Sequence, residues 1–449
     1  MRIVIFSTNT NQFNKEEFCI EQVLNSTIYN TNCIKKYTYS EIILAYQFPG
    51  TFLIDLNRMN SENSENNNIK RHELKGKTAA EIAGEILKLN PDIAIQATFW
   101  TEPFDWIPLQ DCRIGEILSA HGIKTICHPV KTALICFNKR RSRDFLNGNS
   151  FAAAKSVYIH HELFRIERSH PEILNNPYQE IVFEKIRKLK FPVIIKDSFG
   201  LSSYGMDVVS TFPMAKNILM SKKNSGDRLV EEFLDGPQFG TEIHGTPGNY
   251  TIFPPFMFST NQYGITSPKQ SVKIGPVLNE KYNLQEFFST MNRLAEKLNL
   301  CGTAQVDLVF HNKKWYVLEV NPRLSGLTPA ISCSCGKSFE ELLLDVAFMQ
   351  NEKNPKMKYV LDLKFPVLGS EMLKKLSEFK SVLFVRQMLN KKARQHREEG
   401  FCEVIFGSRA SLLELENDLK NLKENFQEII EPAFFEKARK MLDELNSPD

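Results

Sequence analysis

One stretch of the 449-residue chain decides its fold: Val317-Leu318-Glu319-Val320-Asn321-Pro322-Arg323-Leu324-Ser325-Gly326. An acid, an amide and a guanidinium stand at alternate positions where an apolar strand ends. Alternate residues of a strand point to the same face, so we expect Glu319, Asn321 and Arg323 to face one site. Carboxylate and amide oxygens suit a divalent cation, and a guanidinium fork suits a phosphate.

The preceding stretch predicts a partner strand. Residues 303–310 read Thr-Ala-Gln-Val-Asp-Leu-Val-Phe and alternate in polarity, with Gln305 and Asp307 on one face. A short polar turn, Asn312-Lys313-Lys314, separates this segment from the next strand. Two alternating strands joined by a short polar turn indicate a β-hairpin.

The register of this hairpin determines its chemistry. With a three-residue turn, Asp307 lies opposite Glu319 and Gln305 lies opposite Asn321. Two carboxylates directly opposite each other destabilise a sheet, and a cation between them would remove that penalty. A slip of one residue would separate the two acids. The alternative interpretation is a solvent-exposed hairpin whose acids are merely hydrated.

Composition places the chain among soluble globular proteins. Hydrophobic residues make up 42% and charged residues 24% of the sequence, and its length allows about three domains. A net charge of +3 gives no support to a nucleic-acid partner. No apolar run approaches the roughly 20 residues that cross a bilayer. Nine cysteines without paired CxxC spacing predict reduced thiols in the cytoplasm and no zinc site.

The first segment, residues 1–128, is expected to be an α/β domain. Strand and helix patterns alternate along it, which favours a parallel sheet. The predicted strands are 2–6, 93–95 and 123–127, and the predicted helices are 79–87 and 115–120.

Three further segments follow, at residues 129–235, 236–350 and 351–449. In the first two we predict helices at 131–146, 284–298 and 339–349 and strands at 191–196, 206–210, 228–234 and 240–244. The last segment is βαβ-like in composition, with strands at 381–389 and 401–406 and helices at 412–422 and 432–445.

A loop rich in Gly and Ser offers a phosphate site. Gly200-Leu201-Ser202-Ser203-Tyr204-Gly205 follows a strand that ends in Lys196. Backbone N–H groups and the Ser202 and Ser203 hydroxyls suit phosphate oxygens, and Lys196 adds a cation. Such residues also occupy ordinary hairpin turns. The loop is neither a Walker A motif nor a dinucleotide fingerprint.

Taken together, these motifs resemble ATP-grasp enzymes. Gln305-Val306-Asp307 followed by Glu319-Val320-Asn321-Pro322-Arg323 is similar to the metal-binding hairpin of carbamoyl-phosphate synthetase, and the acid at 307 is similar to D-alanine–D-alanine ligase. The resemblance implies Mg²⁺ (or Mn²⁺) bound by Asp307, Glu319 and Asn321, with Gln305 as a further ligand. It also implies that Arg323 is catalytic, contacting the transferred phosphoryl group.

The resemblance extends over residues 129–350. Phe191-Pro192-Val193-Ile194-Ile195-Lys196 and the loop after it resemble the flap over the ATP phosphates, and Asn138-Lys139 resembles an earlier phosphate-binding site. Lys139 also stands in a basic run, 139–141, so a solvated charge is the alternative. The resemblance implies a nucleotide-binding subdomain at 129–235 and a metal-binding, catalytic subdomain at 236–350, both α+β, with 351–449 as a C-terminal α/β lobe.

Residues 229–236 resemble the adenine-binding hinge of the family. The resemblance implies that Glu231 accepts from the adenine amino group and that Phe233 and Leu234 supply backbone or apolar contacts. Gln238 stands where the family usually has a ribose-binding Glu, and an amide can still bond a hydroxyl. Glu242 is an alternative residue facing the ribose or the metal. His244 is interpreted as structural.

The function implied is that of an ATP-dependent carboxylate–amine ligase acting through an acyl phosphate, on an amino acid or small peptide. Its partners would be a small-molecule carboxylate and amine, with a homodimer as the assembly often found in the family. ATP-grasp kinase chemistry and a non-catalytic ATP-binding module are the alternatives. Lys269 and Lys273 either hold a substrate carboxylate or phosphate, or are solvated. Trp100, Phe104 and Trp106 either line a pocket or pack.

Overall fold

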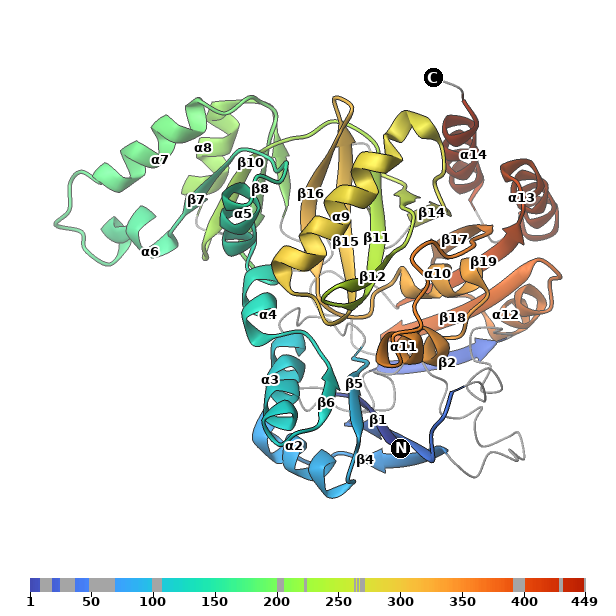
Figure 1. Ribbon diagram of the computed structural model, residues 1–449. Coiled ribbons are helices and arrows are strands. Elements are labelled where there is room, and N and C mark those ends of the chain that lie inside the picture. Colours follow the sequence, from blue (N-terminus) through green and yellow to red (C-terminus); the bar gives the residue numbers. More distant parts are fainter. Residues whose placement is uncertain are drawn as a thin grey trace.

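The computed structural model describes residues 1–8, 18–24, 37–47, 69–98, 107–199, 206–221, 224–261, 264, 266, 271–390, 400–427 and 431–447. Three sheets organise these residues (Figure 1). The predicted Gly/Ser loop with Ser202 and Ser203, Lys269, and the aromatic residues Trp100, Phe104 and Trp106 lie outside the described residues. None of the described helices is long and apolar enough to span a membrane.

The N-terminal sheet is parallel, as predicted. Its order is β4-β3-β1-β5-β6, and every neighbouring pair runs parallel. The strands are β1 (Arg2–Ser7), β3 (Glu41–Tyr46), β4 (Ile69–Glu73), β5 (Ile93–Gln96) and β6 (Lys124–Ile126). Helices α2 (Ala79–Lys88) and α3 (Ile107–Ala120) pack with β1 and β5 around one core. A capping box between Thr78 and Glu81 fixes the start of α2.

The second sheet is a small antiparallel one that projects from the body (Figure 1). Its order is β7-β10-β8-β9, with β7 (Ser156–Ile159), β8 (Val193–Asp197), β9 (Asp207–Val209) and β10 (Arg228–Glu232). The helical segments beside it are α6 (His161–Phe164), η4 (Ile166–Arg168), α7 (Pro177–Arg187) and α8 (Phe212–Met220). The strands predicted at 191–196, 206–210 and 228–234 are confirmed.

The helix predicted over residues 131–146 is wrong in one respect, because it is two helices. They are α4 (Val130–Cys136) and α5 (Lys139–Gly148). Asn138 lies between them in an extended conformation, and its side chain accepts a hydrogen bond from the backbone of Arg141. An Asn in this position is a favoured helix cap, so it starts a new helix and places Lys139 in the first turn.

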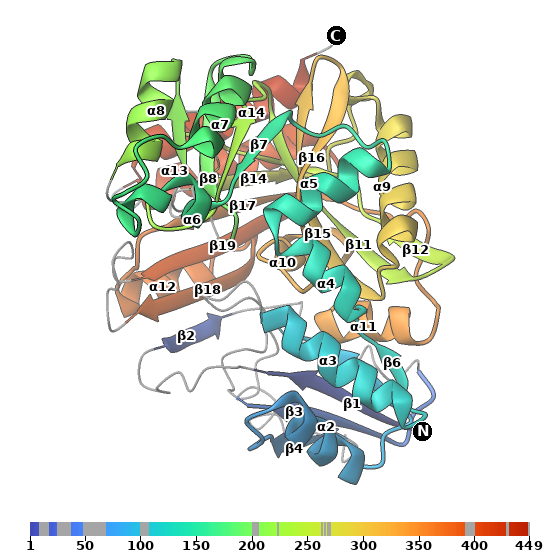
Figure 2. The same ribbon diagram turned by 90° about the vertical axis from the view of Figure 1, so that its left-hand side faces the viewer.

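The third sheet contains the remaining ten strands of the described residues. Its order is β16-β15-β11-β13-β14-β17-β19-β18-β2, with β12 paired to β11. The strands are β2 (Phe18–Leu24), β11 (Gln238–Thr246), β12 (Asn249–Ile252), β13 (Phe256–Phe258), β14 (Ser271–Gly275), β15 (Gly302–His311), β16 (Lys314–Asn321), β17 (Tyr359–Phe365), β18 (Val382–Asn390) and β19 (Gly400–Arg409). Strand β2 comes from the N-terminal segment and lies along the outer edge beside β18 (Figure 2).

Strands β17, β19 and β18 correct the βαβ interpretation of residues 351–449. They pair antiparallel with one another, and β17 also pairs with β14. The C-terminal strands therefore extend the sheet that carries the predicted metal site. Helices α12 (Ser370–Ser377), α13 (Leu412–Phe426) and α14 (Pro432–Asn446) accompany these strands.

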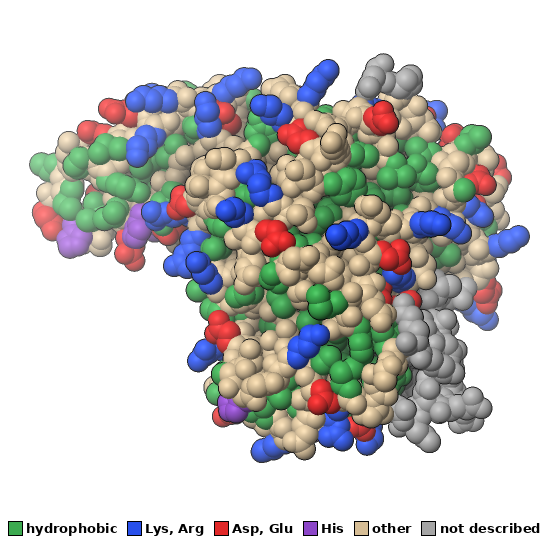
Figure 3. Space-filling model, viewed as in Figure 1, with side chains coloured by type: hydrophobic (Ala, Val, Ile, Leu, Met, Phe, Trp, Pro, Cys, Tyr) green, Lys and Arg blue, Asp and Glu red, His purple; other side chains and the backbone are tan. Residues whose placement is uncertain are grey.

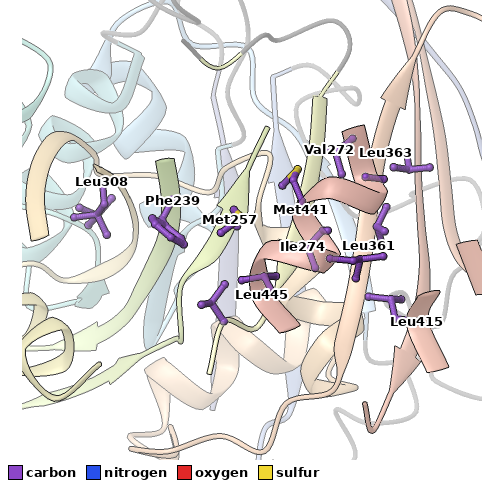
Figure 4. Close-up of a cluster of buried hydrophobic side chains, with 14 of the residues drawn as sticks. Phe239, Met257, Val272, Ile274, Leu308, Leu361, Leu363, Leu415, Met441 and Leu445 are labelled. Carbon is purple, nitrogen blue, oxygen red and sulfur yellow. The ribbon is translucent and has the colours of Figure 1, made fainter. Parts of the chain in front are cut away.

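One hydrophobic core runs behind this sheet. Figure 4 shows side chains of neighbouring strands, among them Phe239, Met257, Val272, Ile274 and Leu361, close to Leu415 of α13 and Leu445 of α14. Helix α9 covers the hairpin end of the sheet and spans Leu284–Leu298, as predicted. Its core face holds Phe287, whereas Phe288 is only partly buried. The remaining helical segments are η5 (Glu280–Tyr282), α10 (Thr328–Cys335) and α11 (Phe339–Ala347).

Candidate functional site

The hairpin β15–β16 has the predicted pairing. Asp307 lies opposite Glu319, and Gln305 lies opposite Asn321. The predicted turn, however, is wrong: Lys314 belongs to the strand, and Asn312 and Lys313 form a two-residue turn with positive φ. Such a turn alone would place Leu318 opposite Asp307. A bulge between Asp307 and Leu308 shifts the register by one residue and brings the two acids together.

Polar side chains converge on Asp307. Gln305 Nε2 donates to Asp307 Oδ1 at 2.8 Å, and Asn321 Nδ2 lies 3.4 Å from Asp307 Oδ2. Arg323 Nη2 donates to Asn321 Oδ1 at 3.3 Å. Burial and, secondly, the charge of Glu319 raise the pKa of Asp307 to about 7. The structure thus brings the four predicted metal ligands and Arg323 to one place.

The donor set fits a hard divalent cation. No group of three or more His, Cys, Asp or Glu suited to a metal occurs in the described ranges, so a cation here would have two carboxylates and the neighbouring amide oxygens as protein ligands. All of these ligands are oxygens, as Mg²⁺ prefers, and Mg²⁺ usually completes its shell with phosphate and water oxygens. The pair of partly buried acids, whose shared site raises the pKa of Asp307 to about 7, is the observation that favours a cation.

A lysine lies directly beside the acid pair. Lys139 Nζ is 3.2 Å from Glu319 Oε1, and only 7% of the lysine side chain is exposed. Burial alone would raise the pKa of Glu319, but Lys139 and Lys196 hold it below its ordinary value. The backbone N–H of Lys139 donates to Ser198 O at 3.0 Å, which ties α5 to the end of β8. The solvated-charge alternative for Lys139 is therefore wrong.

Lys196 belongs to a buried triad with Glu231 and Arg143. Both cations contact the Glu231 carboxylate, whose pKa is about 2 because the two cations outweigh the effect of burial. Burial lowers the pKa of Lys196 to about 8. Sequence reasoning missed Arg143, although it stands four residues after Lys139 on the same helix face.

Arg143 also joins the small sheet to the metal hairpin. Its Nη1 donates to Val317 O at 3.2 Å and its Nη2 to Leu318 O at 2.9 Å. The same side chain thus fixes Glu231 of β10 and the backbone of β16. This contact sets the distance between Lys196 of the small sheet and the acids of the hairpin.

A cleft lies between the two sheets. It encloses about 810 Å³, part of it open to solvent. Its wall contains eight of the predicted site residues: Lys139, Lys196, Glu231, Phe233, Leu234, Gln238, Asp307 and Glu319. The amide of Gln238 donates to Gly264 O. The nucleotide contacts assigned to Glu231, Phe233, Leu234 and Gln238 stay predictions.

Glu242 bonds to the segment that follows Arg323. It is fully buried, and Ser325 and Thr328 each donate a hydrogen bond of 2.6 Å to its Oε1. Its Oε2 lies 2.7 Å from His244 Nε2, which agrees with a structural His244. Because Ser325 and Thr328 follow Arg323, Glu242 anchors the segment that carries this arginine.

Magnesium binding is expected to depend on pH through Asp307. The acid must lose its proton to bind a cation, and its pKa is raised to about 7. Affinity for Mg²⁺, measured by calorimetry, should therefore rise as pH increases from 6 to 8 and level off above that range, by about tenfold per pH unit below the pKa. In Asp307→Asn this dependence should disappear, and a pH-independent affinity in the unsubstituted protein would contradict the assignment.

Fold and site together define a class of protein. It is an α/β protein with a cleft between two antiparallel sheets, with lysines on one wall and paired acids on the other. Residues 165–327 match the family model of the ATP-grasp domain. The chain therefore carries an ATP-grasp domain, and the resemblance drawn from its motifs is confirmed.

Known proteins support this result. A carbamoyl-phosphate synthase from Methanobrevibacter smithii is 24% identical over 208 residues, 44% of this chain and 56% of that protein. A D-alanine–D-alanine ligase from Buchnera aphidicola subsp. Schizaphis graminum is 29% identical over 248 residues, 53% of this chain and 76% of the ligase. The chain spans just over half the length of the first relative.

A solved structure shares the fold over almost the whole chain. The L-amino acid ligase from Bacillus licheniformis superposes with a TM-score of 0.62 at 16% identity, covering 94% of this chain and 97% of that one. The shared region includes the N-terminal sheet and the C-terminal strands, which the family model does not reach.

Proposed function

We propose that this protein is an ATP-dependent carboxylate–amine ligase that uses ATP and Mg²⁺ and releases ADP. The observation that carries the proposal is the opposed pair Asp307 and Glu319, which lines one cleft together with Lys139 and Lys196. Two relatives support amino-acid substrates by their names, a D-alanine–D-alanine ligase and an L-amino acid ligase of the same fold. The acid and the amine are small molecules in this proposal.

Each group at the site has a role in phosphate chemistry. Lys139 and Lys196 neutralise phosphate oxygens of ATP, and Arg323 stabilises the charge of the transferred phosphoryl group. A Mg²⁺ held by Asp307, Glu319, Asn321 and Gln305 would supply further positive charge beside the phosphates. Buried lysines are effective here because a low dielectric strengthens their interaction with anions.

The reaction would proceed in two displacements. A carboxylate oxygen of the first substrate attacks the γ-phosphorus, the bond to the β-phosphate oxygen breaks, and ADP leaves. The amine nitrogen then attacks the acyl carbon, phosphate leaves, and the nitrogen loses a proton to form an amide. Neither step needs a nucleophilic side chain, since charge neutralisation and alignment lower the barrier.

The test is phosphate release from ATP and Mg²⁺ in the presence of pooled amino acids. We expect release that requires two pool members, stops when EDTA removes the metal, and yields a product whose mass equals acid plus amine minus one water. A product that instead gains one phosphoryl group would indicate a kinase. Tight ATP binding without turnover for any pool would contradict ligation of amino acids.

A further inference from the structure

Four polar side chains form a buried network beside the segment that carries Arg323. They are Glu242 and His244 of β11, and Ser325 and Thr328 of the segment that leads into α10. At most 1% of each of these four residues is exposed. Burying polar groups is costly unless they are hydrogen-bonded. A network whose members are bonded to one another holds its surroundings in one arrangement.

The two hydroxyls of the network have fixed hydrogen-bond roles. Ser325 Oγ and Thr328 Oγ1 each donate to Glu242 Oε1 at 2.6 Å. Ser325 Oγ also accepts from Leu327 N, and Thr328 Oγ1 accepts from Ser325 N, both at 2.9 Å. A hydroxyl has a single proton to donate, so both hydroxyls use theirs on Glu242. This carboxylate therefore fixes the conformation of residues 325–328.

The same segment holds the guanidinium of Arg323. Arg323 Nη1 donates to Leu324 O at 3.2 Å, and Arg323 N donates to Asn321 O at 2.8 Å. Leu324 directly precedes Ser325, so a displacement of Ser325 also moves the carbonyl that accepts from the guanidinium. Glu242 thus acts on the position of Arg323 across one residue of backbone.

His244 binds the other oxygen of Glu242. Its Nε2 lies 2.7 Å from Glu242 Oε2, and because a carboxylate only accepts hydrogen bonds, Nε2 is the donor. The imidazole also meets the ring of Phe253 edge to face, with ring centres 4.8 Å apart. Removing a donor from a buried acceptor leaves that acceptor at a cost. His244 therefore determines which way the Glu242 carboxylate points.

A second pocket, separate from the cleft, reaches His244. It encloses about 280 Å³, part of it open to solvent, and none of its lining residues also lines the cleft. Phe253 and Leu342 contribute to its apolar wall, and Asn351 and Glu352 to its polar wall. The Nδ1 atom of His244 is buried and has no hydrogen-bond partner among the described residues. This pocket is therefore a path by which a small molecule from solution reaches the place of the imidazole.

We propose that His244 is a positioning residue for Arg323, because it orients Glu242, which holds residues 325–328 and through them the guanidinium. The proposal rests on the ligase function proposed above, in which Arg323 stabilises the transferred phosphoryl group. His244 lines the second pocket and not the cleft, so it acts through Glu242 and not on the reacting groups. Its loss should lower kcat and leave the binding of ATP intact.

The test removes the imidazole and then supplies it from solution. In His244→Ala the kcat of phosphate release should fall about ten- to hundredfold, the cost of a misplaced group in an active site, while the KM for ATP stays within about twofold. Added imidazole can enter through the second pocket and donate to Glu242, so it should restore most of the lost kcat. His244→Gln, whose side-chain amide can also donate to Glu242, should retain most of the kcat without imidazole.

Two controls establish that the effect passes through Arg323. In a protein that already carries Arg323→Ala, the substitution His244→Ala should lower kcat no further, since residues that act as one unit are not additive. His170→Ala removes an imidazole whose side chain is 54% exposed, and neither this substitution nor added imidazole should alter kcat. Additive losses, or a kcat of His244→Ala that imidazole leaves unchanged, would overturn the proposal while leaving the ligase function intact.

Hydrogen exchange of the backbone at residues 323–328, measured by mass spectrometry, gives a readout that does not depend on turnover. Exchange in this segment should be faster in His244→Ala and slow down again with imidazole, because the segment opens more readily without its anchor. If no amino-acid pool gives phosphate release, the ligase function is refuted, but this exchange pattern would still support the positioning of Arg323. Exchange in His244→Ala equal to that of the unsubstituted protein would overturn the proposal, whatever the turnover.

Discussion

Glu319→Gln is expected to lower the kcat of ATP-dependent phosphate release by about 10²- to 10³-fold. The substitution keeps the size of the side chain but removes one of the two carboxylates at the metal site. It also removes the partner of Lys139, whose Nζ lies 3.2 Å from Glu319. Affinity for Mg²⁺ should fall with it, because the remaining protein ligands carry a single negative charge.

A second readout separates this effect from a general loss of structure. Glu319 is one cause of the raised pKa of Asp307, after burial. In Glu319→Gln the pH midpoint of Mg²⁺ binding should therefore move below its value in the unsubstituted protein. Glu371→Gln, at an acid 87% exposed on α12, is the matched control. A kcat within threefold of the original for Glu319→Gln would refute the metal assignment.

The hairpin could be predicted because its information is local. Acid, amide and arginine at alternate positions fix the face that they share, whatever the rest of the chain does. The opposition of Asp307 and Glu319 was nevertheless predicted from a wrong turn. The bulge at Asp307 and Leu308 compensates for the shorter turn, and nothing in an alternating sequence distinguishes a three-residue turn from a two-residue turn with a bulge.

The contacts that complete the site could not be predicted, because they join residues far apart in the chain. Arg143 meets Glu231 across 88 positions, and Lys273 meets Asp362 across 89. Periodicity indicates which face of a strand is polar, but it does not indicate which strand lies beside it. For the same reason β18 and β19 were recognised as strands, while β17 and the place of all three in the large sheet were not. The partners of Glu242, Ser325 and Thr328, could not be predicted either, because they lie more than 80 residues away.

Exposed ion pairs and buried ion pairs contribute differently to the stability of this protein. Figure 3 shows Lys and Arg interspersed with Asp and Glu over the face in view, so isolated exposed pairs there contribute little to stability. The triad of Arg143, Lys196 and Glu231 is different, because 3% of the Arg143 and Glu231 side chains and 8% of that of Lys196 are exposed. Breaking a buried ion pair by removing one partner leaves an unpaired charge in a low dielectric.

Glu231→Gln is expected to destabilise the folded protein by about 3–5 kcal/mol. The substitution leaves Arg143 and Lys196 as two adjacent buried cations without a counter-charge. Urea unfolding followed by circular dichroism should show a lower midpoint for Glu231→Gln. The control Glu184→Gln, at an exposed acid on α7 beside the same small sheet, should leave the midpoint unchanged. An unchanged midpoint for Glu231→Gln would mean that the triad contributes nothing to the fold.

The free energy of unfolding at low pH should depend on the same triad. The pKa of Glu231 is about 2 in the folded protein, below the ordinary value of 4.5. Its contribution is therefore fully present above about pH 5 and is lost as pH falls toward 2, a change of about 3 kcal/mol at 1.36 kcal/mol per pKa unit. Glu231→Gln should flatten this part of the pH profile. Arg143 also donates to Val317 O and Leu318 O. Glu231→Gln should therefore weaken the binding of Mg²⁺ and ATP even at pH 8, where the remaining fold is intact. Unchanged affinity at pH 8 would show that the triad stabilises the small sheet without positioning the metal hairpin.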